Sequence, residues 1–125
     1  MAESLTPVDV EDKLHQAITD LTRSQSDLRE ARDAETDAEL TYQSAHRRVL
    51  LSSECPPVRR DGYTAAERDA WVMAQIEDEY AQFRRAEARR KAAEDHLRTV
   101  REISSTVQSL GAMVRTAYNM AGAGE

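Results

Sequence analysis

The feature that most constrains this fold is residues 63–121, which read as one long helix with a start signal and no internal stop. From Ala65 to Leu110 there is neither glycine nor proline, and alanine, glutamate, arginine, glutamine and leucine, all good helix formers, fill the segment. Thr64 and Glu67 have the spacing of a capping box, in which each side chain accepts the other residue's backbone N–H. The sequence therefore predicts a helix over about 64–121, with Gly111 tolerated inside it at a cost of about 1 kcal/mol.

The core positions of this helix recur at alternating steps of four and three residues, a repeat typical of a left-handed coiled coil. They are Ala86, Arg90, Ala93, Leu97, Val100, Ser104, Val107, Gly111, Val114, Tyr118 and Ala121. Upstream, two consecutive steps of three through Tyr80, Phe83 and Ala86 predict a local distortion of the supercoil. Such a helix needs a partner helix along its length.

A second helix is predicted over about 7–51. Thr6 suits the N-cap position, and Pro7 suits the first helical position, where its missing N–H costs nothing. One heptad edge is formed mainly by large residues and the other by small ones: Leu14, Leu21, Leu28, Glu35, Tyr42 and Val49, with Ala17, Ser24, Ala31, Ala38 and Ala45 three residues after the first five. Small residues allow two helices to approach closely, so this edge predicts tight packing.

The linker over 52–63 contains Pro56 and Pro57, which exclude helix, and an Asp61–Gly62 turn signal. Two long helices joined by such a linker predict an all-α fold, an antiparallel coiled-coil hairpin forming one domain over 1–125. An aromatic content of 5% and only four glycines also argue against a sheet protein. In the expected register Tyr42 lies near residues 71–76, and Leu14 lies near residues 100–103.

In this register residues 110–121 extend past the first helix, although they carry much apolar surface. Ile103, Leu110 and Ala117 form a second stripe, which Met113 and Met120 widen. Such a face is usually buried against more than one neighbour, and we expect a homo-oligomer. The alternative is that the second helix bends back over the first and buries this face within the chain. The candidate oligomer or partner interface comprises Val100, Ile103, Val107, Leu110, Val114, Ala117 and Tyr118.

The sequence offers no catalytic constellation. Asp12 and His15 have a spacing found in helical metal sites, but no second carboxylate–histidine pair accompanies them. Cys55 has no histidine near it in sequence, and no glycine-rich phosphate-binding motif is present. We therefore expect a non-enzymatic protein with no cofactor, no metal and no small-molecule substrate.

A basic run in the second helix is the best candidate for nucleic-acid contact. The run also includes Arg90 and Arg101, and its candidate contact residues are Arg84, Arg85, Arg89, Lys91 and Arg98. Three of these, Arg84, Lys91 and Arg98, are spaced by seven and could follow a phosphate backbone. The opposing interpretation is an ordinary solvated face, because Glu87 and Lys91 have the spacing of a helical ion pair. No aromatic residue interleaves the run for base stacking.

The net charge of −6 is unevenly distributed, with −9 over residues 1–80 and +3 over 81–125. The acidic part suggests an alternative function as an inhibitor that occupies a basic groove on a host DNA-processing protein. A single cysteine favours a reducing compartment, and no stretch is apolar enough to span a membrane. We expect a cytoplasmic protein that does not associate with membranes.

The segments YTAAERDAWVMAQIEDEY (63–80) and RTVREISSTVQSLGAMVR (98–115), with the long-helix, loop, long-helix layout, resemble small helical-hairpin proteins of actinobacterial phages. Similar proteins accompany phage replication and recombination genes. The resemblance implies a viral protein in the host-cell cytoplasm. It favours an accessory factor that self-associates and binds a protein of a DNA replication, recombination or regulatory complex. Direct nucleic-acid binding is the alternative. No functional residue is carried over from the resemblance.

Overall fold

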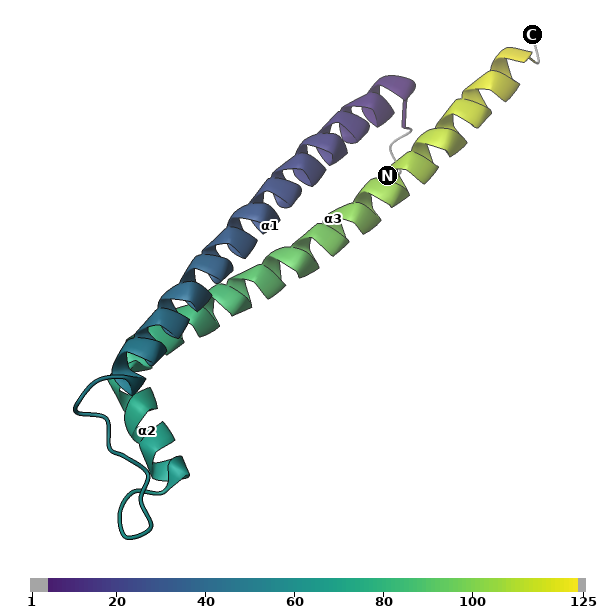
Figure 1. The fold of residues 1–125 in the computed structure, drawn as a ribbon. Coiled ribbons are helices and arrows are strands. Elements are labelled where there is room, and N and C mark those ends of the chain that lie inside the picture. The colour runs from purple at the N-terminus through teal and green to yellow at the C-terminus, as the bar shows by residue number, and fades with distance from the viewer. Residues whose placement is uncertain (1–4, 124–125) are drawn as a thin grey trace. The chain divides into compact units, whose positions relative to one another are not determined.

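The computed structural model describes residues 5–123, and within them the chain is all-α, as expected. It contains α1 (Pro7–Leu50), α2 (Ala65–Gln75) and α3 (Glu77–Ala123) (Figure 1). The two long helices, α1 and α3, pack together. No strand occurs in this part of the chain, where the linker holds one isolated bridge between Val58 and Tyr63.

Both predicted helix starts are confirmed by their hydrogen bonds. At α1, the Asp9 amide donates to the Thr6 hydroxyl at 3.2 Å, and the Thr6 amide donates to the Asp9 carboxylate at 3.0 Å. Hydrogen bonding by the Thr6 backbone N–H, and secondarily by the Thr6 side chain, holds the pKa of the Asp9 carboxyl below its usual value. At α2, Thr64 and Glu67 form the reciprocal capping box.

The predicted single helix over 64–121 is interrupted at Ile76, where α2 ends and α3 begins. Ile76 has φ −120° and ψ 25°, and its N–H donates to the Met73 carbonyl. The helix propensities of these residues do not favour a break here. The break instead accompanies side-chain packing, because Val72 and Ile76 are each only 1% exposed. The acidic run Glu77 to Glu79 then occupies the first turn of α3, where the helix dipole favours negative charge. From Glu77 the helix continues without interruption through the predicted distortion at 80–86.

Contacts divide the chain into two compact units. One comprises Glu30–Lys91, and the other comprises the described residues up to Arg29 together with those from Ala92 onward. In the Glu30–Lys91 unit, a core of Ala45, Val72 and Ile76 is flanked by half-buried Tyr42, Val49, Cys55, Trp71 and Met73. The prediction of a single domain stays a prediction.

Aromatic side chains join α1 to α3 within the Glu30–Lys91 unit. The Tyr42 ring lies 5.4 Å from the Tyr80 ring and 5.7 Å from the Phe83 ring, measured between centroids. The Tyr42 hydroxyl also donates to the Met73 sulfur at 3.7 Å. These separations are typical of tilted and edge-to-face aromatic pairs.

Close packing in the other unit is seen at Gly111 of α3. A Cβ atom placed on Gly111 would lie 3.0 Å from Val10 Cγ1 and 3.9 Å from Leu14 Cδ1. The absence of a side chain at this position therefore lets α1 approach α3. Buried residues of this unit include Val10, Ala17, Ser24, Leu28, Leu97, Val100 and Ser104.

The predicted seam of α1 is confirmed, and that of α3 is buried or half-buried as far as Val114, whereas Tyr118 and Ala121 are exposed. All the heptad positions named in α1 are buried or half-buried.

The predicted position of Tyr42 near residues 71–76 is also confirmed, by its contact with Met73. Leu14, however, lies near Gly111 rather than near residues 100–103, a difference of about two to three turns. The Glu30–Lys91 unit shows a difference in the same direction, because Tyr42 contacts Phe83 of α3 as well as Met73 of α2.

Candidate interaction surfaces

The predicted interface residues of α3 fall into two groups by exposure. Val100 is buried and Val107, Leu110 and Val114 are half-buried, so these four contribute to the packing of the chain itself. Ile103 is 56% exposed, Tyr118 is 50% exposed and Ala117 is also exposed. Their role in an oligomer stays a prediction.

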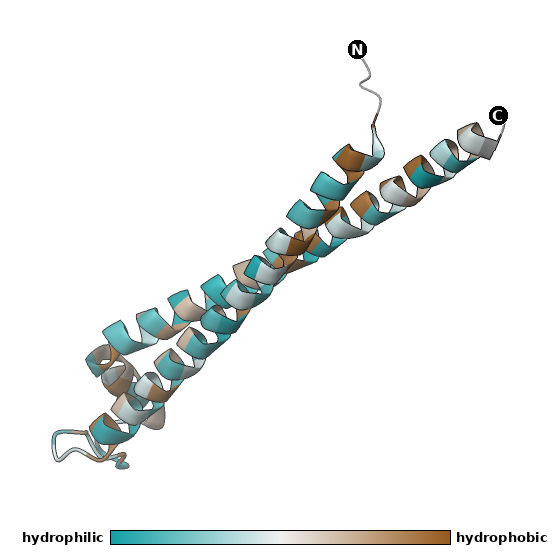
Figure 2. Ribbon diagram, turned by 90° about the horizontal axis from the view of Figure 1, so that it is seen from above, coloured by the Kyte–Doolittle hydropathy of each residue, from teal (hydrophilic) through white to brown (hydrophobic). Residues whose placement is uncertain are grey.

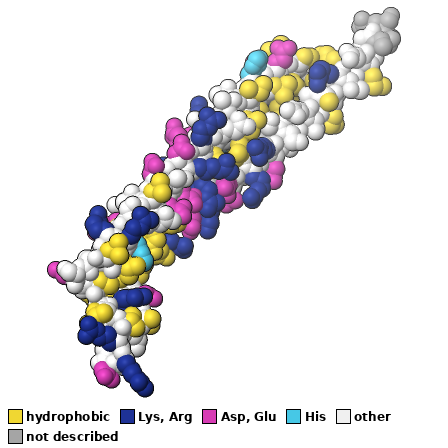
Figure 3. Space-filling model, in the orientation of Figure 1, with side chains coloured by type: hydrophobic (Ala, Val, Ile, Leu, Met, Phe, Trp, Pro, Cys, Tyr) yellow, Lys and Arg dark blue, Asp and Glu magenta, His cyan; other side chains and the backbone are white. Residues whose placement is uncertain are grey.

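Two methionines dominate the exposed face near the end of α3. Met113 is 70% exposed and Met120 is 72% exposed. They line a shallow apolar hollow with Ala112, Thr116 and Ala117. Figure 2 shows hydrophobic residues continuing along α3 towards its last turns, and Figure 3 shows hydrophobic side chains at the surface there. Flexible, polarizable methionines are common at surfaces that bind other proteins.

This part of α3 is also depleted of charge. Between Ile103 and Ala123 the only charged residue is Arg115, although 32% of the whole chain is charged. The Arg115 Nε donates to the Gly111 carbonyl of its own helix at 3.4 Å. A helix end that is largely exposed yet nearly free of charge is unusual for a solvated surface, and charge depletion is typical of interface cores.

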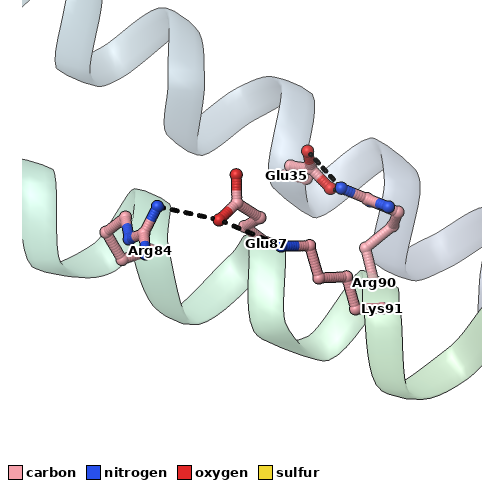
Figure 4. Close-up of polar contacts among 5 residues, drawn as sticks. All are labelled: Glu35, Arg84, Glu87, Arg90 and Lys91. Carbon is pink, nitrogen blue, oxygen red and sulfur yellow. Dashed lines mark hydrogen bonds and ion pairs between the residues drawn. The ribbon is translucent and has the colours of Figure 1, made fainter.

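The basic run is only partly available for binding phosphate. Glu87 accepts from Arg84 at 3.0 Å and lies 3.7 Å from the Lys91 ammonium, as Figure 4 shows. Arg85 and Arg89 are exposed and have no ion-pair partner within residues 5–123. Arg85 and Arg89 therefore stay available for phosphate contact, whereas Glu87 neutralises part of the charge of Arg84 and Lys91 in the predicted stripe.

Arg98 is the remaining member of the run and belongs to the other unit. It donates to Asp95 of its own helix at 3.3 Å, and both side chains are highly exposed. Exposed pairs of this kind contribute little to stability and exchange readily with solvent or ligand.

A half-buried ion pair joins the two long helices within the Glu30–Lys91 unit. The Arg90 guanidinium donates from Nε and Nη2 to the two carboxylate oxygens of Glu35 (Figure 4). Sequence reasoning placed both residues on apolar seams but did not pair them. Their opposite charges at otherwise apolar core positions were the signal that could have identified the pair.

No group of three or more metal-ligating side chains gathers within residues 5–123. Cys55 is half-buried, and its thiol contacts the Pro56 carbonyl at 4.0 Å. None of the helices that the structure describes is both long and apolar enough to cross a membrane.

Comparisons with protein-family models, with curated proteins and with solved structures find no match to this chain.

Proposed function

We propose that this chain is a non-enzymatic, antiparallel helical-hairpin interaction protein that self-associates through the exposed face of α3. The observation that carries the proposal is the apolar, charge-depleted surface around Met113 and Met120. The resemblance of the chain to phage hairpin proteins favours a cytoplasmic accessory role, with a protein of a DNA replication, recombination or regulatory complex as the partner.

The contacts between α1 and α3 support the antiparallel arrangement. In the Glu30–Lys91 unit, Glu35 contacts Arg90, and Tyr42, farther along α1, contacts Phe83, which comes earlier in α3. In the other unit, Val10 near the start of α1 lies beside Gly111 near the end of α3. Within the Glu30–Lys91 unit, residue numbers thus fall in α3 as they rise in α1, as expected of a hairpin.

The exposed side chains can supply enough apolar burial for association. Complete burial of an isoleucine or methionine contributes about 1.5–3 kcal/mol, so the exposed parts of Ile103, Met113 and Met120 would contribute about 1–2 kcal/mol each. Two copies double this contribution to about 6–12 kcal/mol, set against an association cost of about 4–15 kcal/mol. A micromolar complex requires about 8 kcal/mol, which the most favourable ends of these ranges just reach, so association should be no tighter than micromolar.

Sedimentation equilibrium tests this proposal. The wild type should show a dimer or larger species at tens of micromolar, a usual range for weak association. Met113→Asp with Met120→Asp should remain monomeric, because each change places an unpaired carboxylate on the contact face. The matched control is Gln108→Asp with Asn119→Asp, which adds the same charge at exposed positions outside the apolar hollow and should still associate. A wild type that is monomeric throughout this range would reject the proposal.

Direct nucleic-acid binding is a second candidate, favoured by the unpaired Arg85 and Arg89. Arg85→Glu with Arg89→Glu should weaken binding to DNA of any sequence and flatten its salt dependence, since fewer counterions are released. Arg84→Gln is the control, because Glu87 already accepts from this side chain. Absence of binding by the wild type in low-salt gel-shift measurements would eliminate this function.

A further inference from the structure

The exposed face of α3 carries a second heptad seam, distinct from the one that faces α1. We name it seam two; its positions alternate steps of three and four and are Ile103, Thr106, Leu110, Met113, Ala117 and Met120. Five of the six residues are exposed, and Leu110 is half-buried. A regular heptad seam specifies another helix as its occupant, because knobs-into-holes packing requires matching spacing on both sides.

Seam two is self-complementary. When two copies of α3 are placed antiparallel about a point between Gly111 and Ala112, each large residue faces another large residue and each small residue faces a small one. The facing pairs are Ile103 with Met120, Leu110 with Met113, and Thr106 with Ala117, each formed twice. Such reciprocal pairing is the requirement for a closed two-fold interface.

The helix dipoles favour the antiparallel direction over the parallel one. Antiparallel pairing places the start of seam two in one copy beside its end in the other, so the dipoles of the two neighbouring helices oppose each other. Parallel pairing would align them.

We infer that the occupant of this face is a second copy of the chain, packed antiparallel through seam two with Leu110 and Met113 at the centre of a two-fold dimer. The inference rests on the proposed self-association and adds its direction and register. The feature that carries it is the seam itself, which is palindromic in residue size. The flanking residues Ser109 and Thr116 present no charge to the second copy, and the charged flanking residue Glu102 lies at the edge of the seam.

Disulfide trapping between two single-cysteine variants tests this arrangement. Both variants carry Cys55→Ser; one adds Ile103→Cys and the other adds Met120→Cys. In the antiparallel dimer, equivalent cysteines of two identical chains lie about 25 Å apart, far beyond disulfide reach, whereas the two different cysteines face each other. With oxidised glutathione, neither variant alone should cross-link, and their mixture should give a covalent heterodimer.

Ser105→Cys, in the same background, replaces Ile103→Cys in the control mixture because its exposed side chain lies outside seam two. Trapping in this control equal to that in the test mixture would overturn the assigned register. Cross-linking of either variant with itself would show parallel packing and overturn the direction. A mixture that sediments as a dimer but does not cross-link would show that another surface is the interface. A monomer by sedimentation would instead refute the underlying self-association.

Discussion

Enlarging a small seam residue of α1 tests how closely the two long helices pack. Ala31 is 5% exposed, so it has almost no free space around its methyl group. Leucine adds three carbon atoms there, and overpacking of this kind typically costs about 1–3 kcal/mol. Helix propensity contributes little to this loss, because leucine is nearly as good a helix former as alanine.

The thermal midpoint, followed by circular dichroism, should therefore fall by about 4–12 °C in Ala31→Leu, taking about 4 °C for each kcal/mol in a chain of this length. Ala38→Leu should give a smaller loss, since Ala38 is only half-buried. Ala88→Leu provides the matched control on an exposed position of α3 and should change stability by no more than about 0.5 kcal/mol. An Ala31→Leu midpoint equal to or above that of the wild type would refute the close packing of this seam.

Three further perturbations address individual contacts. In a helix, Gly→Ala usually raises the free energy of unfolding by about 1 kcal/mol. Gly111→Ala should not give this gain, because the added Cβ would lie 3.0 Å from Val10 Cγ1. Urea unfolding measures the change, and a full gain would contradict the close packing at Gly111. Glu35→Leu should lower the free energy of unfolding by about 1–3 kcal/mol, since Arg90 loses its contacts with the Glu35 carboxylate. Adding Arg90→Leu should recover most of that loss, and no recovery would show that the pair is not the cause. The Asp9 carboxyl should titrate below 3.8 by NMR; its contribution to stability is therefore complete above this value and is lost as the pH falls through the folded-state pKa, whereas a midpoint at or above 3.8 would contradict the cap.

Local signals predicted most of the helical structure. The capping residues Thr6 and Thr64 mark helix starts that depend only on near neighbours, so the sequence was sufficient to find them. The seams were also predictable, because burial follows the heptad repeat. The break at Ile76 was not, since it depends on packing of Val72 and Ile76 in a core shared with α1. The run Glu77 to Glu79, favourable at a helix start, was the available signal.

The surfaces could be predicted less completely than the helices. The apolar stripe near Met113 and Met120 was visible in the sequence, because its charge depletion and heptad spacing are local properties. Which interface residues contribute to the chain's own packing depends on the register, and Leu14 lies about two to three turns from its predicted position along α3. The sharing of Glu87 between Arg84 and Lys91 required side-chain positions that spacing alone does not define.

Amide hydrogen exchange at two protein concentrations tests most directly whether a second copy covers the end of α3. Residues 112–121 should exchange slowly at high concentration and markedly faster after dilution, because dissociation exposes a helix end that can fray. Residues 97–107 should change less, since Leu97, Val100 and Ser104 are buried within the chain itself. Exchange of residues 112–121 that does not depend on concentration, in samples that span the association range, would contradict the account.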